Sequence, residues 1–108
     1  MKLILLCSSD PLLTKNLYGV LRDEGYAVET VEHPSHAVQA VMRGTFDAMV
    51  IDSEPFGMSA EDAAKVVRTI EPALPILFVG RERDADAPGG RTQLDLESIK
   101  RTIHSIAA

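Results

Sequence analysis

The 108-residue sequence contains a single cysteine, Cys7, and no tryptophan, and aromatic residues make up only 5% of it. A single cysteine excludes a disulfide framework and a cysteine-rich zinc site. No apolar run approaches the roughly 18 residues of a membrane-spanning helix. The N-terminus also lacks the length and the small-residue cleavage site of a signal peptide. We therefore expect a soluble, cytoplasmic chain with no membrane partner.

Positive charge is also scarce, since 11 lysine and arginine residues stand against 16 aspartate and glutamate residues and leave a formal net charge of −5. An acidic chain is repelled by the phosphate backbone of nucleic acid, so direct nucleic-acid binding is not expected. Hydrophobic residues at 45% and charged residues at 25% are ordinary for a globular protein. The length predicts one domain, residues 1–108, built on one core.

Short apolar runs alternate along the chain with segments of helical periodicity. Strands are predicted at residues 3–7, 27–31, 48–51 and 75–79. Helices are predicted after the strands, and Asp10 followed by Pro11 is typical of a helix start. One predicted helix has an inner face made of Ala63, Val66, Val67 and Ile70. This alternation predicts an α/β fold, a flavodoxin-like doubly wound parallel sheet forming a three-layer sandwich of the (βα)5 type.

The ends of the predicted strands carry the candidate functional residues. In a doubly wound sheet, ligands and reacting groups lie at the carboxyl ends of the strands. Polar residues or glycine follow the strands here at residues 8–10, 52–57 and 80–81. We therefore expect the functional site at this edge of the sheet.

Residues 46–52, Phe-Asp-Ala-Met-Val-Ile-Asp, resemble the third strand of the receiver domain of two-component response regulators (CheY-like). In that family the aspartate ending this strand accepts a phosphoryl group, and the matching residue here is Asp52. Residues 75–79 resemble the fourth strand and residues 94–99 the start of the last helix, so the resemblance covers nearly the whole chain. It implies a bacterial two-component or phosphorelay signalling protein, not an enzyme, whose partner is a kinase, an effector domain or another signalling protein.

The phosphorylation pocket implied by the resemblance is replaced at most positions in this sequence. The family binds Mg²⁺ with an acidic pair directly after the first strand, where this chain has Ser8 and Ser9. The family's serine or threonine at the end of the fourth strand corresponds to Gly80, and its fifth-strand lysine corresponds to Thr92. Asp52 is the remaining member of the set, and without a metal and a cation it reads as an ordinary strand-end carboxylate.

These departures favour a degenerate receiver, or pseudo-receiver, that acts as a phosphorylation-independent protein-interaction module and needs no cofactor. The alternative is a response regulator phosphorylated on Asp52. That alternative requires Asp10 and Glu54 to rebuild a Mg²⁺ site, although Asp10 is also the expected helix cap.

The segment of residues 80–93 departs from the family pattern in a second way. In receivers it contains a full helix and most of a fifth strand, whereas here it has no aliphatic residue larger than alanine. Its length is about that of one average helix, ~11–12 residues. We therefore expect the fourth helix to be lost or shortened and the fifth strand to be weak. The loop itself or a second copy in a homodimer would then cover the exposed sheet.

Three arginines in this segment give a further alternative. Arg81, Arg83 and Arg91 lie among acidic residues, as is typical of a solvated loop of mixed charge. Arginine also binds phosphate in a bidentate manner, and Arg81 to Asp84 resembles short cyclic di-GMP-binding motifs. The second alternative is therefore a small-ligand (cyclic dinucleotide) sensor.

Overall fold

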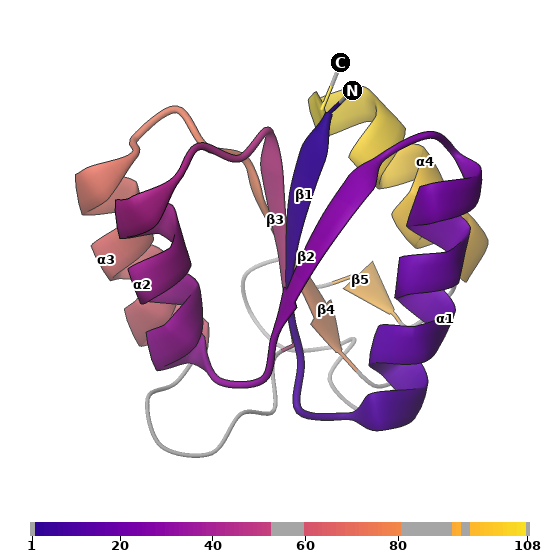
Figure 1. Ribbon diagram of the computed structural model, residues 1–108, viewed down its shortest axis with the longest axis horizontal. Coiled ribbons are helices and arrows are strands. Elements are labelled where there is room, and N and C mark those ends of the chain that lie inside the picture. Colours follow the sequence, from indigo (N-terminus) through magenta and orange to yellow (C-terminus); the bar gives the residue numbers. More distant parts are fainter. Residues whose placement is uncertain (1, 53–59, 81–91, 94–95, 108) are drawn as a thin grey trace.

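The computed structural model describes residues 2–52, 60–80, 92–93 and 96–107. In these residues five parallel strands form one sheet in the order β2-β1-β3-β4-β5 (Figure 1). The strands are β1 (Leu3–Cys7), β2 (Ala27–Val31), β3 (Ala48–Asp52), β4 (Ile76–Gly80) and β5 (Thr92–Gln93). The helices are α1 (Pro11–Asp23), α2 (Pro34–Arg43), α3 (Ala60–Ile70) and α4 (Leu96–Ala107).

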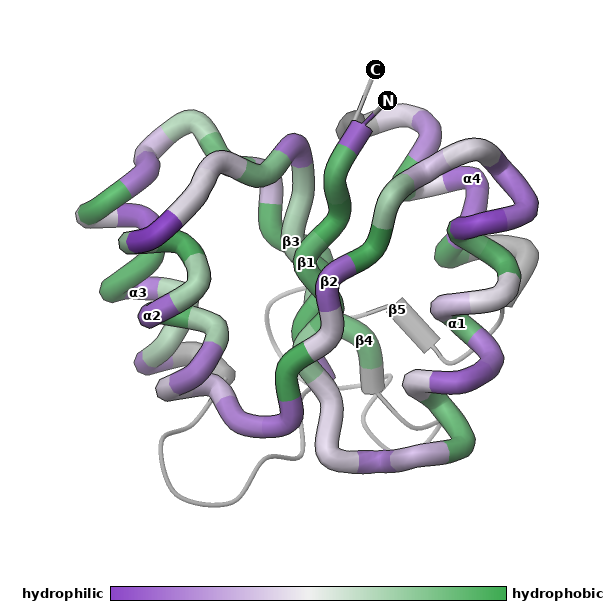
Figure 2. Tube along the Cα trace, in the orientation of Figure 1, coloured by the Kyte–Doolittle hydropathy of each residue, from purple (hydrophilic) through white to green (hydrophobic). Residues whose placement is uncertain are grey.

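The helices cover both faces of the sheet, so the predicted doubly wound three-layer sandwich is confirmed. Helices α1 and α4 lie on one face, and α2 and α3 lie on the other (Figure 1). The two central strands β1 and β3 are hydrophobic along most of their length, whereas the edge strand β2 includes hydrophilic segments (Figure 2). Within the described residues, no helix has the length and apolar character needed to cross a membrane.

The two faces of the sheet are filled by side chains of different size. Large aliphatic residues dominate the face under α1 and α4, where the helices contribute Leu13, Leu17, Leu21, Ile99 and Ile103. Alanines dominate the helical side of the other core, where α2 and α3 contribute Ala37, Ala40, Val41, Ala63 and Val67. Small side chains allow α2 and α3 to approach the sheet and each other closely.

Helix α3 is turned slightly from its predicted orientation. Val66 was expected on the inner face, but 39% of its surface is exposed, whereas Ala64 is fully buried. Helix α3 packs against α2 as well as against the sheet, and its buried stripe includes Ala64. The prediction for Val66 was therefore wrong, and those for Ala63 and Val67 are confirmed.

Helix α1 is positioned by residues that the sequence identifies. The Asp10 side chain caps it by accepting hydrogen bonds from the N–H groups of Leu12 at 3.0 Å and Leu13 at 3.4 Å. Pro11 occupies the first helical turn, where its missing N–H costs no hydrogen bond. After the helix, Gly25 adopts a φ of 91°, a conformation that glycine reaches without strain. These signals start and stop α1 so that the chain returns directly into β2.

The weak fifth strand is confirmed, since β5 consists of two residues that pair with the end of β4. The register places Thr92 opposite Val79 and Gln93 opposite Gly80. The prediction of a lost or shortened fourth helix falls on residues 81–91, which lie outside the described residues. Helix α4 is the predicted final helix, and its Ile99 and Ile103 are fully buried.

Candidate functional site

The carboxyl ends of β1 and β3 meet through a hydrogen bond between Ser8 and Asp52. The register pairs Cys7 with Ile51, so the next residues of the two strands lie side by side. The Ser8 hydroxyl donates to Asp52 Oδ2 at 3.1 Å, and the Asp10 N–H donates to the Ser8 oxygen at 3.1 Å. Ser8 is 3% exposed. One buried hydroxyl therefore joins the end of β3 to the segment that starts α1.

Asp10 holds a structural position at this edge of the sheet. Its Oδ1 atom caps α1 by accepting hydrogen bonds from the N–H groups of Leu12 and Leu13. A carboxylate at a helix start is also favoured by the helix dipole. The predicted N-cap role of Asp10 is confirmed.

Cys7 lies beside the strand-end carboxylate and is a buried free thiol. Burial, and secondarily the negative charge of Asp52, raise the pKa of the Cys7 thiol to about 12. The thiol therefore stays protonated at neutral pH and behaves as a small apolar side chain.

The remaining predicted site residues are distributed along the same edge or lie outside the described residues. Asp52 pairs with Val79, and Gly80 follows one residue later on β4. Thr92 on β5 pairs with Val79, which brings its backbone to the same end of the sheet. Ser9 is exposed. Outside the described residues lie Glu54, Arg81, Arg83 and Arg91, whose proposed roles stay predictions.

The described donors do not fit the Mg²⁺ ion that the receiver pattern implies. Mg²⁺ requires oxygen ligands in near-octahedral geometry and usually includes carboxylates. Within the described residues, no group of three or more histidine, cysteine, aspartate or glutamate side chains is placed to hold a metal. The Asp52 carboxylate accepts a hydrogen bond from the neutral Ser8 hydroxyl. Oδ1 of Asp10 accepts hydrogen bonds from two backbone N–H groups. Within the described residues, both carboxylates thus accept hydrogen bonds from neutral donors.

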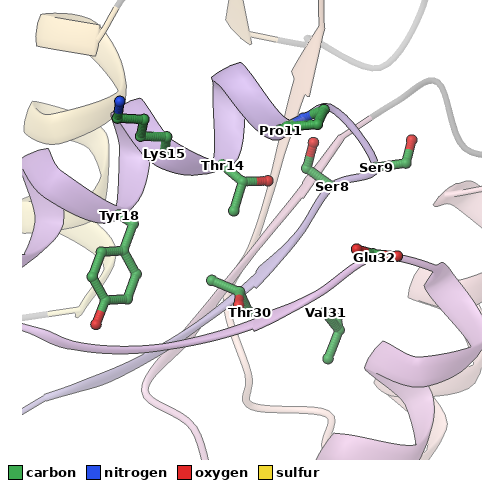
Figure 3. A pocket seen from close by; sticks show the side chains of 9 residues that line it. All are labelled: Ser8, Ser9, Pro11, Thr14, Lys15, Tyr18, Thr30, Val31 and Glu32. Carbon is green, nitrogen blue, oxygen red and sulfur yellow. The ribbon is translucent and has the colours of Figure 1, made fainter.

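A pocket of about 390 Å³ opens between α1 and β2, next to the Ser8 segment (Figure 3). Its lining residues are Ser8, Ser9, Pro11, Thr14, Lys15, Tyr18, Thr30, Val31 and Glu32. Sequence reasoning identified Ser8 and Ser9 but missed Lys15, Tyr18 and Glu32. The available signal was the polar character of residues 29–32, which is unusual for a strand of a parallel sheet.

Comparison with known sequences gives a partial similarity to a curated protein. No family model matches the chain. The transcriptional regulatory protein TcrA of Mycobacterium tuberculosis is 33% identical over 76 residues, which is 70% of this chain and 30% of TcrA. The chain thus spans less than a third of the length of this curated relative.

Solved structures match the fold over almost the entire chain. The response regulator TrrA from Thermotoga maritima, in complex with Mg²⁺ and beryllofluoride, superposes with a TM-score of 0.87 and 20% identity, covering 98% of this chain and 99% of TrrA. The receiver domain of the sensor histidine kinase PA1611 from Pseudomonas aeruginosa, with magnesium in its active-site cleft, gives a TM-score of 0.85 and 19% identity, covering 98% and 97%. The chain therefore has the CheY-like, flavodoxin-type fold of response regulator receiver domains.

Proposed function

We propose that residues 1–108 form a degenerate receiver domain of bacterial two-component signalling, which binds a protein partner in the cytoplasm independently of phosphorylation and catalyses no reaction. The hydrogen bond from Ser8 to Asp52 carries this proposal. Ser8 stands where the receiver pattern has one of its acidic residues. The Asp52 carboxylate thus accepts a hydrogen bond from a neutral side chain at the position where members of the family bind a metal ion.

Phosphoryl transfer to Asp52 would bring additional negative charge to this site. Phosphoryl transfer is catalysed almost entirely by positioning and by cations that stabilise the transferred group. The Ser8 hydroxyl that donates to Asp52 is neutral and supplies no positive charge. A phosphoryl group on Asp52 would displace the Ser8 hydrogen bond and add negative charge to this strand end. A neutral donor at Asp52 therefore favours a protein whose conformation is set without phosphate.

The relatives indicate which kinds of partner to test. TcrA is a transcriptional regulatory protein, and the PA1611 domain belongs to a sensor histidine kinase. We accordingly propose a kinase, an effector domain or another signalling protein as the partner, and a homodimer as an alternative assembly. The net charge of −5 argues against direct contact with nucleic acid.

The proposal is tested by titrating the ¹⁵N-labelled chain with MgCl₂ and then with beryllofluoride, a mimic of the aspartyl phosphate. We expect no saturable amide shifts at Ser9, Asp10 or Asp52 at millimolar Mg²⁺. A double variant, Ser8→Asp with Ser9→Asp, restores the acidic pair and should gain Mg²⁺-dependent shifts at the same amides. Adding Asp52→Asn to that double variant should abolish the beryllofluoride response.

Saturable shifts in the wild-type chain would overturn the proposal and support the phosphoacceptor alternative on Asp52. The variant Asp10→Asn then tests whether Asp10 supplies the missing carboxylate, because it should remove the Mg²⁺ response. Glu54→Gln makes the same test for the second predicted ligand.

A further inference from the structure

Strand β2 presents an unpaired backbone edge to its surroundings. It is the terminal strand of the sheet, next to β1. The Ala27 N–H donates to the Lys2 carbonyl at 2.9 Å, and the Val31 carbonyl accepts the Ser8 N–H at 3.0 Å, so the odd-numbered residues face β1. Because hydrogen-bonding direction alternates along a parallel strand, Val28 and Thr30 direct their N–H and C=O groups outward. No backbone partner for them exists among the described residues.

The α1–β2 pocket adjoins this edge. Val28 packs against the core under α1 and α4, and Thr30, two residues later, projects toward the same face. Figure 3 shows Thr14, Lys15 and Tyr18 of α1 on one wall of the pocket, with Thr30 and Glu32 on the opposite wall. A volume of about 390 Å³ is enough to receive side chains of an incoming segment. A strand added along β2 would place every second side chain over this pocket.

The charges around the pocket are arranged for a partner of complementary charge. Within the described part of the chain, Lys15 and Glu32 line the pocket without an ion pair between them or to other residues. Glu29, on the opposite face of β2, is already paired with Arg43 at 3.8 Å. The start of α1 is a poor binding site for an anion. The Asp10 side chain already accepts hydrogen bonds from the N–H groups of Leu12 and Leu13, and Pro11 has no N–H.

We propose that β2 binds an extended segment of a partner protein as an added strand, with a basic side chain of that segment beside Glu32 and an acidic one near Lys15. Main-chain hydrogen bonds to Val28 and Thr30 would supply affinity, and the pocket would select side chains. The inference deepens the proposed function and relies on it only in taking the partner to be a protein. A second copy of the chain is a less favourable occupant, because two chains that each carry a net charge of −5 repel each other.

The test uses a displayed library of short random peptides selected on the whole chain. We expect the selected peptides to carry a lysine or arginine together with an acidic residue, matching Glu32 and Lys15. Titration of one such peptide into the ¹⁵N-labelled chain should shift the amides of Val28 and Thr30 and slow hydrogen exchange at the Thr30 N–H. The peptide should also shift Lys15 and Tyr18 across the pocket.

Two variants separate the charge contribution from the backbone contribution. Glu32→Lys should weaken the selected peptide roughly tenfold, as expected for loss of one close charge pair. Glu71→Lys changes the net charge equally at an exposed residue after α3 and should leave affinity unchanged. Thr30→Pro removes an outward N–H at an edge position that tolerates proline, and should abolish binding, whereas Thr30→Ala should retain it.

The inference fails if no peptide is selected, if the shifts map to α2, α3 or α4, or if Glu32→Lys binds as well as the wild type. Amide shifts of β2 that change on dilution without peptide would instead identify a second copy as the occupant and would also overturn it. Beryllofluoride added to the same sample keeps the two proposals apart. If the Asp52 amide shifts with beryllofluoride while the peptide still binds, only the degenerate-receiver proposal is contradicted. If the Asp52 amide does not shift and no peptide binds along β2, only the proposal of an added strand at β2 is contradicted.

Discussion

The two faces of the sheet solve the same packing problem with different side chains. Under α1 and α4 the helices bury long aliphatic residues such as Leu17 and Ile103, whereas α2 and α3 bury mainly alanines such as Ala37 and Ala63. Long side chains fill the space between a helix and the sheet, and short ones allow two helices to pack closely on it. The α1–α4 face should therefore be sensitive to truncation, and the α2–α3 face to enlargement.

Truncation on the α1–α4 face should have the largest effect. Leu17 is fully buried, so Leu17→Ala should lower the free energy of unfolding by about 2–5 kcal/mol. Leu12→Ala, on the same helix at a residue 67% exposed, should change it by less than about 0.5 kcal/mol. Urea unfolding followed by circular dichroism measures both. Equal costs at the two positions would contradict the assigned face of α1.

Enlargement on the α2–α3 face should have the next largest effect. Ala37 is fully buried, so Ala37→Leu should force neighbouring side chains apart and cost about 1–3 kcal/mol. Gln39→Leu adds the same side chain at an exposed position of α2 and is the control. The measurement is again the urea midpoint. A neutral or stabilising Ala37→Leu would show that this face has unfilled volume, and the contrast between the faces would disappear.

The hydrogen bond between Ser8 and Asp52 should contribute to the free energy of unfolding by an amount comparable to, or smaller than, the effect of Ala37→Leu. Ser8→Ala removes the donor to Asp52 and the acceptor for the Asp10 N–H, and should cost about 1–3 kcal/mol. Ser9→Ala, at the neighbouring exposed residue, should be close to neutral. Thermal unfolding of the two variants makes the comparison. If Ser9→Ala were the more damaging change, the central role given to the Ser8 hydroxyl would be wrong.

The smallest effect should be a pH dependence of the free energy of unfolding that is caused by Cys7. This residue is buried on the α2–α3 side of the sheet. Its pKa is raised from 9.0 to about 12, so above pH 9 the unfolded chain loses a proton that the folded chain keeps. Stability from the neutral thiol is therefore complete below about pH 9 and declines as the pH rises, by roughly 1 kcal/mol at pH 10. The free energy of unfolding, measured from pH 7 to 10, should decline in this way for the wild-type chain and not for the Cys7→Ala variant. Parallel curves for the two proteins would refute the assignment.

Much of the fold could be predicted because its signals are local. The strand at Ala27–Val31, the Asp10–Pro11 helix start and the turn at Gly25 depend on residues adjacent in sequence. The inner face of α3 was partly mispredicted at Val66 because the position of a neighbouring helix is not a local property.

The site was only partly predictable, for a related reason. The sequence placed Ser8 and Asp52 at strand ends, but their hydrogen bond depends on the register between β1 and β3. The pocket formed by Lys15, Tyr18 and Glu32 depends on how α1 lies across β2, and no periodicity encodes that arrangement. Local patterns thus identify which residues reach the edge of the sheet, and tertiary packing decides which of them touch.

The shared hydroxyl of Ser8 has a mechanical consequence. It has one proton, which it gives to Asp52, and it accepts the N–H of Asp10, whose side chain holds the first turn of α1. A rotation of the Ser8 side chain about its Cα–Cβ bond would move this oxygen and disturb both hydrogen bonds, so a rearrangement of the strand end is coupled to the helix start. By thermodynamic reciprocity, any event that perturbs Asp52 and any molecule that grips the start of α1 would change each other's free energy by the same amount.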